Sequence, residues 1–386
     1  MSQDNYCQIP FSHLFINTWG GISPCCAHKI DPDKQLNIAD DENWLQNWLT
    51  SDYLKSVQES FIENKRHVGC TDECWVPEDA GLSSLRTRTA NEYKFLGGKR
   101  AIQKLITAEI QIGNLCNYGC LMCVPRSSSF ILKENLEIGL DKFNNKSHLW
   151  RNKPLFKEQY KWSDEEISRL EQLLNLDLRL LTVRGGEPFY NKKLLEIIRK
   201  LPSEKASTMM LHIDTNASIW NDNWQEVLEK FKLVRIMFSV DGTDDIYEYI
   251  RYPGIWEITK NNILKIIQLK NINPVIHCVV QNLNIKYLDS LIDFAVENNI
   301  HINLVTVEQE YLHSKNLTDN DRKIAIENLS KWISTKKYPE YIVIQLQAFL
   351  NLIEKSKFDL DRWNEFVEYV TIKDTHRGNS YKKFLN

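Results

Sequence analysis

The middle of the chain alternates short apolar runs, rich in β-branched residues, with longer stretches in which apolar residues recur every three or four positions. The short runs are typical of buried strands and the longer ones of amphipathic helices. Six strands are predicted, at residues 105–112, 178–183, 208–213, 233–240, 274–280 and 301–307. Helices are predicted between them, at residues 163–174, 192–201, 224–231, 256–270 and 285–299. Ser163 and Glu166 have the spacing of a capping box at the start of the first helix.

Regular alternation of strands and helices indicates a parallel sheet whose strands are joined by crossover helices. The pattern therefore predicts an α/β fold, as a βα barrel or an open sheet. After residue 310, apolar periodicity predicts two further helices, at 314–333 and 341–355, followed by a tail at 374–386 that docks back on the protein.

Composition narrows the class of protein. The 386 residues are 42% hydrophobic and 26% charged, with a formal net charge of −3. These values indicate a soluble globular protein and give no reason to expect a nucleic-acid partner. No window reaches the about 18 apolar residues that a membrane span needs, and the N-terminus does not resemble a secretory signal. We expect a cytoplasmic location, where the nine cysteines stay reduced.

Unusual residues follow five of the predicted strands. The segment "NLCNYGCLMC" follows the first, "RGGEPFY" the second, "DTNAS" the third, "SVDGTDD" closes the fourth, and "QNLN" follows the fifth. The carboxyl ends of parallel strands meet at one edge of a barrel or sheet. The five segments are therefore expected to converge on one site.

Three cysteines in the first segment, Cys116, Cys120 and Cys123, have the spacing C-x3-C-x2-C. A structural zinc site uses four ligands, and a catalytic zinc site usually includes His or a carboxylate. A 4Fe–4S cluster takes one cysteine per iron, so three cysteines leave one iron open. An amino acid, with its amine and carboxylate, could chelate that iron.

The triad, the Gly185-Gly186-Glu187-Pro188 segment and the "SVDG" strand end together resemble the radical S-adenosylmethionine (SAM) enzymes over residues 105–310. The resemblance implies a partial (β/α)6 barrel, a 4Fe–4S cluster on the triad, and SAM on the open iron. It implies reductive cleavage of SAM to a 5′-deoxyadenosyl radical that abstracts hydrogen from a substrate. It also implies a reducing partner such as flavodoxin or ferredoxin.

The resemblance assigns SAM-binding roles to the second segment. Gly185 and Gly186 would permit close approach of the backbone, and Pro188 would stiffen the turn. Glu187 would accept a hydrogen bond from the methionyl ammonium. Met122 stands where related enzymes often have an aromatic residue, and its thioether could cover the adenine.

Later strand ends carry the remaining residues implied by the resemblance. Ser239 and Asp241 would form a polar pair near the cofactor, and Arg251 would pair with its carboxylate. Asn216 lies where related enzymes have Thr-Asn-Gly, but the next residue here is Ala217, so a positive φ is not expected there.

Two further features belong to the expected site. Asn282 would bond a ribose hydroxyl. The segment 127–161, between the first strand and the first barrel helix, is too long for an ordinary βα loop and is expected to form a substrate wall or lid.

The first hundred residues hold a second group of cysteines. Cys7 and Cys25, with Gly20 five residues before Cys25, resemble half of the auxiliary-cluster module called SPASM, or its shorter form, twitch. Cys70 and Cys74 would complete four ligands for a second 4Fe–4S cluster. The module precedes the barrel here, whereas it usually follows it. Cys26 is a rival to Cys25, and zinc on the same four thiols is an alternative.

The sequence therefore predicts three parts: a twitch-like domain at 1–104, a radical SAM partial barrel at 105–310, and a helical extension at 311–386. The predicted function is a radical SAM enzyme, an oxidoreductase or C–H modifying enzyme, acting on a peptide or small-molecule substrate. The alternatives are an iron–sulfur electron carrier or redox sensor, and a zinc-stabilised binding module. Cys278, alone in an apolar strand, is expected to be a core thiol.

Overall fold

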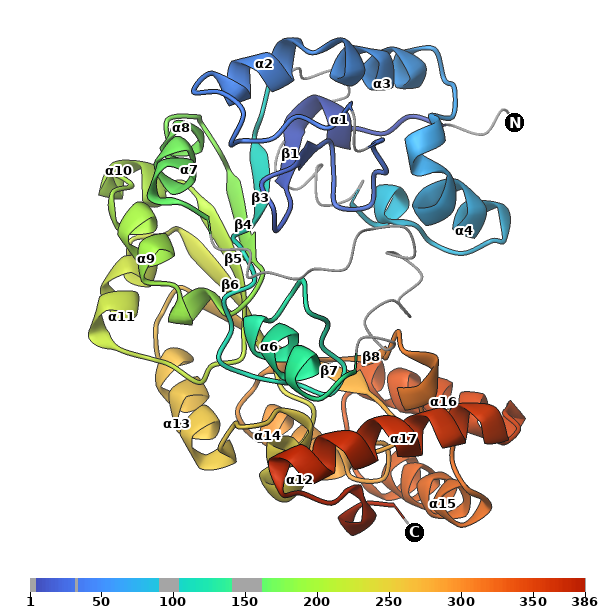
Figure 1. Ribbon diagram of the computed structural model, residues 1–386. Helices are drawn as coiled ribbons and strands as arrows, with labels where there is room; N and C mark the ends of the chain where they lie inside the picture. Colours follow the sequence, from blue (N-terminus) through green and yellow to red (C-terminus); the bar gives the residue numbers. More distant parts are fainter. Residues whose placement is uncertain (1–4, 32–33, 90–103, 141–161, 386) are drawn as a thin grey trace. The chain divides into compact units, whose positions relative to one another are not determined.

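The computed structural model describes residues 5–31, 34–89, 104–140 and 162–385 (Figure 1). The chain divides into two compact units. The first contains residues 1–114, 160–213 and 222–234, and the second contains residues 115–159, 214–221 and 235–386.

All six predicted strands are present. They are β3 (Thr107–Gln111), β4 (Leu180–Arg184), β5 (Met210–Thr215), β6 (Leu233–Ser239), β7 (Ile272–Val280) and β8 (His301–Thr306). The sheet has the order β2-β1-β3-β4-β5-β6-β7-β8. The ladders β1–β3, β3–β4, β4–β5 and β7–β8 are parallel. The predicted fold class, an α/β partial barrel followed by C-terminal helices, is confirmed.

Two strands at the start of the sheet were not predicted. β1 (His13–Ile16) pairs in parallel with β3, and β2 (Ile22–Ser23) pairs antiparallel with β1. The apolar run "HLFI" of β1 is only four residues long, which is too short for a periodicity signal. The N-terminal segment thus adds two strands to the barrel sheet, and the three-part domain division stays a prediction.

Short helices make up the rest of the N-terminal segment. They are α1 (Ile9–Ser12), α2 (Trp44–Thr50), α3 (Asp52–Ile62), the 3-10 turn η2 (Val68–Cys70), the π-helical turn η3 (Thr71–Trp75) and α4 (Val76–Asp79). Ser51 caps α3, because its hydroxyl accepts a hydrogen bond from the amide of Leu54 at 3.2 Å.

The remaining helices of the first unit follow β3, β4 and β5 in the sequence. They are α7 (Asp164–Arg169), α8 (Glu171–Leu174), η6 (Pro188–Tyr190), α9 (Lys192–Arg199), α10 (Ser203–Ala206) and α11 (Asp222–Glu229). The capping box is confirmed: Ser163 Oγ accepts from the amide of Glu166 at 3.1 Å, and Glu166 Oε2 accepts from the amide of Ser163 at 2.6 Å. The predicted helix 163–174 is divided in two at Leu170.

Strands β3 to β5 have one apolar face and one polar face. Residues such as Leu181 and Val183 on the apolar face are almost completely buried. On the other face the register places Glu109, Thr182 and His212 side by side on three neighbouring strands. Side chains alternate between faces along a strand, so this alternation assigns the helices to one side and leaves a polar surface on the other.

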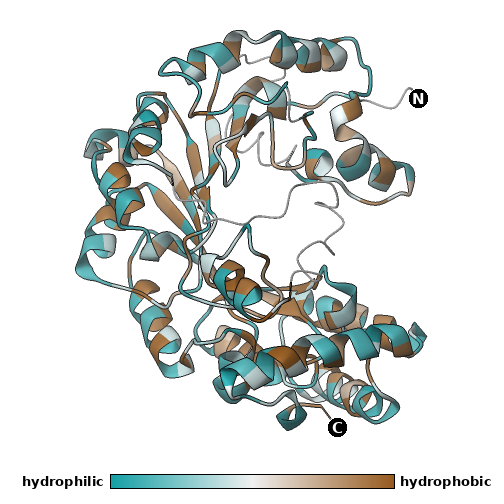
Figure 2. Cartoon of the chain, viewed as in Figure 1, coloured by the Kyte–Doolittle hydropathy of each residue, from teal (hydrophilic) through white to brown (hydrophobic). Residues whose placement is uncertain are grey.

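The second unit contains one helix after the cysteine triad and a larger C-terminal set. These are α6 (Ser129–Glu137), α12 (Asp244–Ile250), α13 (Trp256–Ile266), α14 (Leu288–Glu297), η7 (Glu310–Leu312), α15 (Asp319–Thr335), α16 (Glu340–Lys355), α17 (Leu360–Arg377) and η8 (Tyr381–Lys383). The helices are hydrophobic on one side and hydrophilic on the other (Figure 2). The predicted tail begins inside α17, whose end is marked by Gly378 at a φ of 68°.

The tail after α17 docks as expected. The amide of Tyr381 donates to Asp374 Oδ2 at 2.7 Å, and Phe384 packs against Tyr249 with ring centroids 5.1 Å apart. Of the expected lid at 127–161, the structure describes α6, and residues 141–161 lie outside the described part. In the described ranges, no helix has the length and apolar character that crossing a membrane requires.

Candidate active site

A loop in the second unit carries the triad of cysteines. They are Cys116, Cys120 and Cys123. Helix α6 fixes the loop through two serines: the amide of Cys116 donates to Ser129 Oγ at 3.2 Å, and the hydroxyl of Ser128 donates to the carbonyl of Tyr118 at 2.7 Å. Ser128 is also the N-cap of α6 and accepts from the amide of Ile131. The cap of a helix and the shape of the loop therefore depend on one side chain.

The residues after α12 pair with the backbone of this loop. The amide of Gly119 donates to the carbonyl of Tyr252 at 2.6 Å, and the amide of Leu121 donates to the carbonyl of Ile250 at 2.9 Å. Together with the contacts to α6, these bonds hold the loop from two sides. The loop is thus preorganised for a ligand, which reduces the ordering cost of binding one.

Two donors face the sulfur atoms. The amide of Tyr118 donates to Cys116 Sγ at 3.4 Å, and Nη1 of Arg251 donates to Cys120 Sγ at 3.7 Å. Burial and then the neighbouring Cys120 raise the pKa of Cys123 to about 12, while Arg251 acts in the opposite direction. A metal that binds these thiols must displace their protons, and a nearby cation favours the thiolate form.

Arg251 is buried and paired inside the protein. Its Nε lies 2.7 Å from Asp241 Oδ2, and Asp241 Oδ1 accepts from the amide of Val279 at 2.7 Å. Burial raises the pKa of Asp241, and the Arg251 charge opposes that shift. The structure therefore links Asp241, Arg251 and Cys120 in a row, and the predicted pairing of Arg251 with a cofactor carboxylate stays a prediction.

Asn216 reaches the triad loop from the end of β5. Its Nδ2 donates to Asn117 Oδ1 at 3.1 Å, and Asn117 Nδ2 donates to Ser218 Oγ at 2.9 Å. Ala217, which lies between Asn216 and Ser218 in the sequence, has a φ of 53°. A left-handed conformation is therefore used at this position although a glycine is missing, and for a non-glycine residue it costs about 1–2 kcal/mol.

Two buried amide side chains follow β7. Gln281 and Asn282 are each 0% exposed. Within the described residues, the side-chain oxygens of both lack a hydrogen-bond partner. Nε2 of Gln281 lies 3.9 Å from Met122 Sδ, and the carbonyl of Met122 accepts from Gln309 at 2.7 Å. Buried acceptors without partners are unusual and suit donors of a bound molecule, such as hydroxyls. Ser239, at the end of β6, is half-buried.

The glycine turn after β4 belongs to the first unit. Gly185 and Gly186 have φ values of 90° and 54°, and a Cβ on Gly185 would lie 3.0 Å from the carbonyl oxygen of Gly113. Glu187 is 1% exposed, and its Oε1 accepts from the amide of Phe189 at 2.9 Å. Pro188 opens the 3-10 turn η6. Both glycines are thus required by the backbone.

The predicted ligands of the second cluster lie together in the first unit. Cys7, Cys70 and Cys74 belong to one buried apolar group, and Cys25 packs against it. Burial raises the pKa of Cys25 well above its usual range, and after the adjacent Cys26 the next causes are Cys7 and Cys70.

Cys26 has different surroundings. It is exposed, whereas Cys25 is half-buried. Although the residue is exposed at the surface, protein atoms surround its thiol, and this burial raises the pKa of the Cys26 thiol to about 12. The next cause is Glu109 on β3. The two adjacent cysteines therefore face different neighbours, and Cys25 is the one that faces the cysteine group.

A buried ion pair that no sequence pattern had indicated flanks that group. Arg86 pairs with Glu78, with side chains 12% and 6% exposed. Its guanidinium also stacks over the Trp75 ring at 5.0 Å and donates to the carbonyl of Tyr6 at 2.9 Å. Its charge lowers the pKa of Cys7, although burial dominates and raises that pKa to about 12. A cation beside several thiols favours their ionised, metal-binding form.

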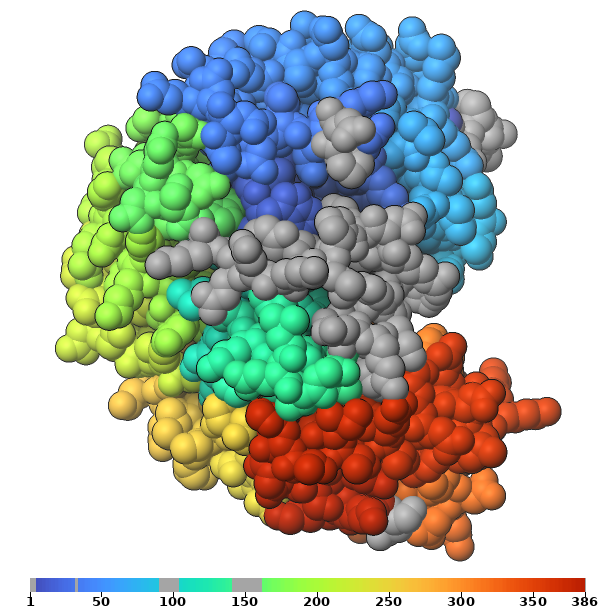
Figure 3. Space-filling model, in the orientation of Figure 1, coloured from blue at the N-terminus to red at the C-terminus, as the bar shows by residue number. Residues whose placement is uncertain are grey.

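Helix α17 is a second feature that the sequence did not reveal. Tyr369 donates to the carbonyl of Leu121 at 2.7 Å, and Arg377 donates to the carbonyl of Gly119 at 2.6 Å. Lys373 and Arg377 both pair with Glu134 of α6, with all three side chains at most 2% exposed. Figure 3 shows the C-terminal helices in red directly against the green segment that contains α6. The two charged residues Glu134 and Lys373 are 239 residues apart in the sequence, so no local sequence pattern could have indicated this contact.

Parallel strands followed by a loop of three cysteines are typical of the class of enzymes that bind a metal cluster at the carboxyl ends of their strands. Residues 110–295 match the family model of the radical SAM superfamily. The chain therefore contains a radical SAM domain over these residues. No match is found among the curated proteins.

Three solved structures are among those to which the chain shows a distant similarity. SuiB from Streptococcus suis bound to the precursor peptide SuiA has 13% identity and a TM-score of 0.39, covering 95% of this chain and 69% of its own. TsrM from Kitasatospora setae, a radical SAM methyltransferase with cobalamin and a [4Fe-4S] cluster bound, has 9% identity and a TM-score of 0.37. The match covers 61% of this chain and 42% of TsrM. TYW1 with a lysine–pyruvate adduct has 15% identity and a TM-score of 0.31, covering 61% and 72%.

Proposed function

We propose that this enzyme cleaves SAM reductively, abstracts hydrogen from a peptide, and carries a second, auxiliary cluster. The observation that carries the proposal is the gathering of Cys7, Cys25, Cys70 and Cys74 into one buried group, in addition to the triad loop of the radical SAM domain. Two separate cysteine groups, each flanked by a buried arginine, are more than a single-cluster electron carrier needs.

The triad would hold the first cluster. A 4Fe–4S cluster bound by Cys116, Cys120 and Cys123 would supply one electron to SAM, giving methionine and a 5′-deoxyadenosyl radical. Arg251 offsets the negative charge at Cys120, and the amide of Tyr118 stabilises the thiolate of Cys116. The donor set therefore fits the cluster.

The predicted SAM contacts are supported by chemistry at several positions. The carboxylate of Glu187 would accept from the methionyl ammonium, with Gly185, Gly186 and Pro188 shaping the turn around it. The unpartnered oxygen of Asn282 would accept from a ribose hydroxyl.

Four residues near the triad would take supporting roles. Met122 would cover the adenine. Asn216 would brace the triad loop through Asn117, and Asp241 would orient Arg251. Ser239 would line the cofactor pocket at the end of β6.

The auxiliary site suits a cluster better than a single zinc ion. Tetrahedral zinc with bonds of about 2.3 Å places its sulfur ligands about 3.8 Å apart. Among the described residues, the ion-sized ligand group that includes one of these four cysteines is Cys70 with His28 and His67, and Cys7, Cys25 and Cys74 are not part of it. A cubane core is larger than one ion and holds its thiolates farther apart.

Cys25 is proposed as the ligand in place of Cys26. Cys25 packs against the group of the other three, and Cys26 is exposed and faces Glu109. Iron content separates them: Cys25→Ala is expected to lose the auxiliary cluster, and Cys26→Ala to keep it. The opposite result would remove the proposed ligand set.

The polar sheet face supports a peptide as the substrate. Glu109, Thr182 and His212 lie in register, and Arg184 pairs with Glu109 at 3.3 Å. Charged and hydroxyl side chains at the barrel strands match the amides and charges of a peptide better than an apolar metabolite. The reductant would be a flavodoxin or ferredoxin, and the location cytoplasmic.

The test uses anaerobically prepared protein and a variant in which Cys116, Cys120 and Cys123 are all Ala. The variant is expected to stay brown and folded but to release no 5′-deoxyadenosine from SAM and dithionite. Uniformly deuterated peptides are then added to the unmodified enzyme, and deuterium in 5′-deoxyadenosine reports abstraction. A colourless triple variant would contradict the proposed auxiliary cluster. Deuterium transfer from small metabolites but not from peptides would contradict the proposed peptide substrate.

A further inference from the structure

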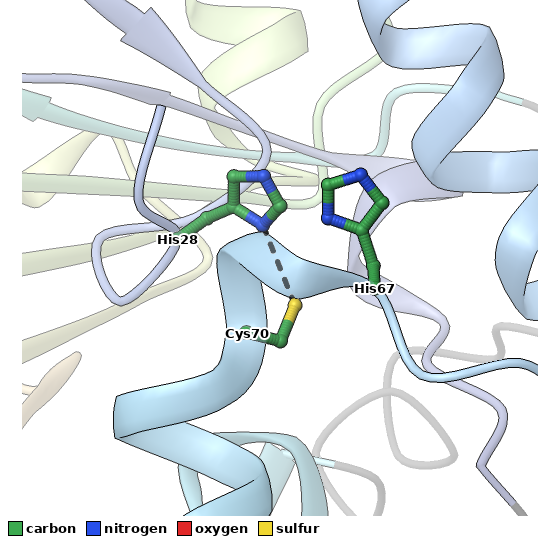
Figure 4. Close-up of side chains that lie close together, drawn as sticks. All are labelled: His28, His67 and Cys70. Carbon is green, nitrogen blue, oxygen red and sulfur yellow. Dashed lines mark hydrogen bonds between the residues drawn. The ribbon is translucent and has the colours of Figure 1, made fainter. Parts of the chain in front are cut away.

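Cys70 has a histidine against its sulfur. His28 Nδ1 lies 3.4 Å from Cys70 Sγ, as the dashed line in Figure 4 marks. His67 lies beside His28, and one ligand atom from each of the three residues falls within 4.8 Å of the others (Figure 4). Nothing in the radical SAM chemistry described above uses either histidine.

The position of His28 is fixed by its neighbours. Nε2 of His28 lies 2.8 Å from the hydroxyl of Tyr53, and the ring stacks on His67 with centroids 5.1 Å apart. Gly69 leaves the room for the ring, since a Cβ there would lie 2.5 Å from His28 Nε2. The adjacent Lys29 pairs with the carbonyl of Gly69 through its amide at 2.9 Å. His28 therefore has one defined orientation, with Nδ1 toward the sulfur.

The direction of the hydrogen bond follows from the ligand role of Cys70. A thiolate bound to iron carries no proton, so the hydrogen between the two atoms belongs to His28 Nδ1. Nε2 is then an acceptor. The hydroxyl of Tyr53 donates to it across the shorter contact of 2.8 Å, in preference to the carbonyl of Lys29 at 3.4 Å. The chain Tyr53, His28, Cys70 repeats the general pattern in which an outer partner fixes the tautomer of an imidazole at a metal site.

We propose that His28 is a positioning residue for the auxiliary cluster: its Nδ1–H donates to the sulfur of Cys70 and raises the reduction potential of that cluster. The inference rests on the proposed second cluster and deepens it. Reduction adds negative charge to the cluster and its thiolates, and a donor at the sulfur stabilises the more negative state. His28 thereby favours electron uptake by the auxiliary cluster.

The same three residues could be regarded as ligands of one metal ion, and His67 separates the two possibilities. His67 Nδ1 accepts a hydrogen bond from the amide of Gly69 at 3.1 Å and so caps η2. In a neutral ring the other nitrogen then carries the proton, which leaves no lone pair for a metal. Cys70, in contrast, has Cys7 and Cys74 as electrostatic neighbours that raise its pKa further after burial. Cys70 thus belongs with the other cysteines.

The experiment uses the full chain with Cys116, Cys120 and Cys123 changed to Ala, in which only the auxiliary cluster absorbs. Its midpoint potential is measured by redox titration followed by electron paramagnetic resonance. His28→Leu removes the donor and is expected to lower the equilibrium constant for reduction about tenfold, equivalent to about 59 mV for one electron. His28→Asn places an amide N–H near the former Nδ1 and is expected to restore the potential. His67→Asn, which can still cap η2, is the matched control and is expected to leave it unchanged.

Each other outcome overturns the inference in a recognisable way. An unchanged potential in His28→Leu, with iron retained, overturns the role of His28 and leaves the second cluster in place. Equal loss of one zinc ion from His28→Leu and His67→Asn identifies a single-ion site instead. A triple variant without iron overturns the second cluster itself, and the role of His28 with it.

Discussion

The hydroxyl of Tyr369 donates a 2.7 Å hydrogen bond to the carbonyl oxygen of Leu121, which lies between Cys120 and Cys123. Tyr369 is 2% exposed, so water does not compete for this contact. The last long helix therefore holds the backbone of the loop that carries the triad, from a position 248 residues later in the sequence.

Tyr369→Phe removes this donor and leaves the carbonyl of Leu121 without it. We expect the free energy of unfolding to fall by about 1–3 kcal/mol, and iron to leave the triad faster during chelation. Tyr341→Phe is the control, since the ring of Tyr341, at the start of α16, stacks on His301 of β8 and not on the triad loop. Urea denaturation and chelation kinetics under nitrogen give both quantities. Equal rates of iron loss in the two variants would contradict the prediction.

Glu134→Gln tests the buried charges between α6 and α17. Two cations, Lys373 and Arg377, share this carboxylate, and removing one partner of a buried pair costs about 3–5 kcal/mol. The matched control is Glu137→Gln on the same helix, whose exposed pair with Lys133 contributes about 0.5 kcal/mol or less. A Glu134→Gln protein as stable in urea as Glu137→Gln would show that the buried pair is energetically neutral.

Glu187→Gln separates the charge of this residue from its structural role. Gln can still accept from the amide of Phe189, so the turn after β4 is kept. A charge-assisted hydrogen bond between the Glu187 carboxylate and the methionyl ammonium contributes about 1.5–3 kcal/mol to binding. Because the Gln side chain carries no charge, the variant is expected to bind SAM roughly tenfold to a hundredfold more weakly. Calorimetry on reconstituted protein measures the affinity. Unchanged affinity, with unchanged iron content, would remove Glu187 from the SAM site.

His13 predicts a loss of stability in acid. Burial and then the charge of Arg184 lower its pKa from 6.5 to about 4. Between pH 6.5 and 4 the unfolded chain binds the proton and the folded protein does not, so stability falls as the pH falls through this window. The slope from one such group is at most about 1.4 kcal/mol per pH unit. His13→Asn can still reach Thr107 but does not titrate, and a urea midpoint equally sensitive to pH in this variant would exclude His13 as the cause.

The sequence was sufficient for the elements that carry a repeating local pattern. All six barrel strands, the capping box at Ser163 and the three-cysteine loop follow from periodicity or fixed spacing. Such features are encoded within a few residues of one another, so one sequence is enough to find them.

Features formed between distant segments could not be predicted in this way. β1 is a four-residue strand that exists because β3 offers it an edge, and α17 contacts the triad loop through single side chains such as Tyr369. The positive φ of Ala217 was missed because local preference argues against it, and the packing around the residue decides otherwise. Pairing energy from the tertiary structure outweighs local propensity in each case.

The contact between Tyr369 and Leu121 also sets an order of events during synthesis. At about 5–20 residues per second, a ribosome needs roughly 12–50 s to add the 248 residues that separate them. During that time the nascent chain already contains all three thiols of the triad, but helix α17, which holds their loop, has not yet been synthesised. Iron delivered before α17 is complete would meet a loop without this contact. Durable loading of the triad is therefore a step that follows completion of α17, and a nascent chain stalled before residue 369 would be a poor recipient of iron.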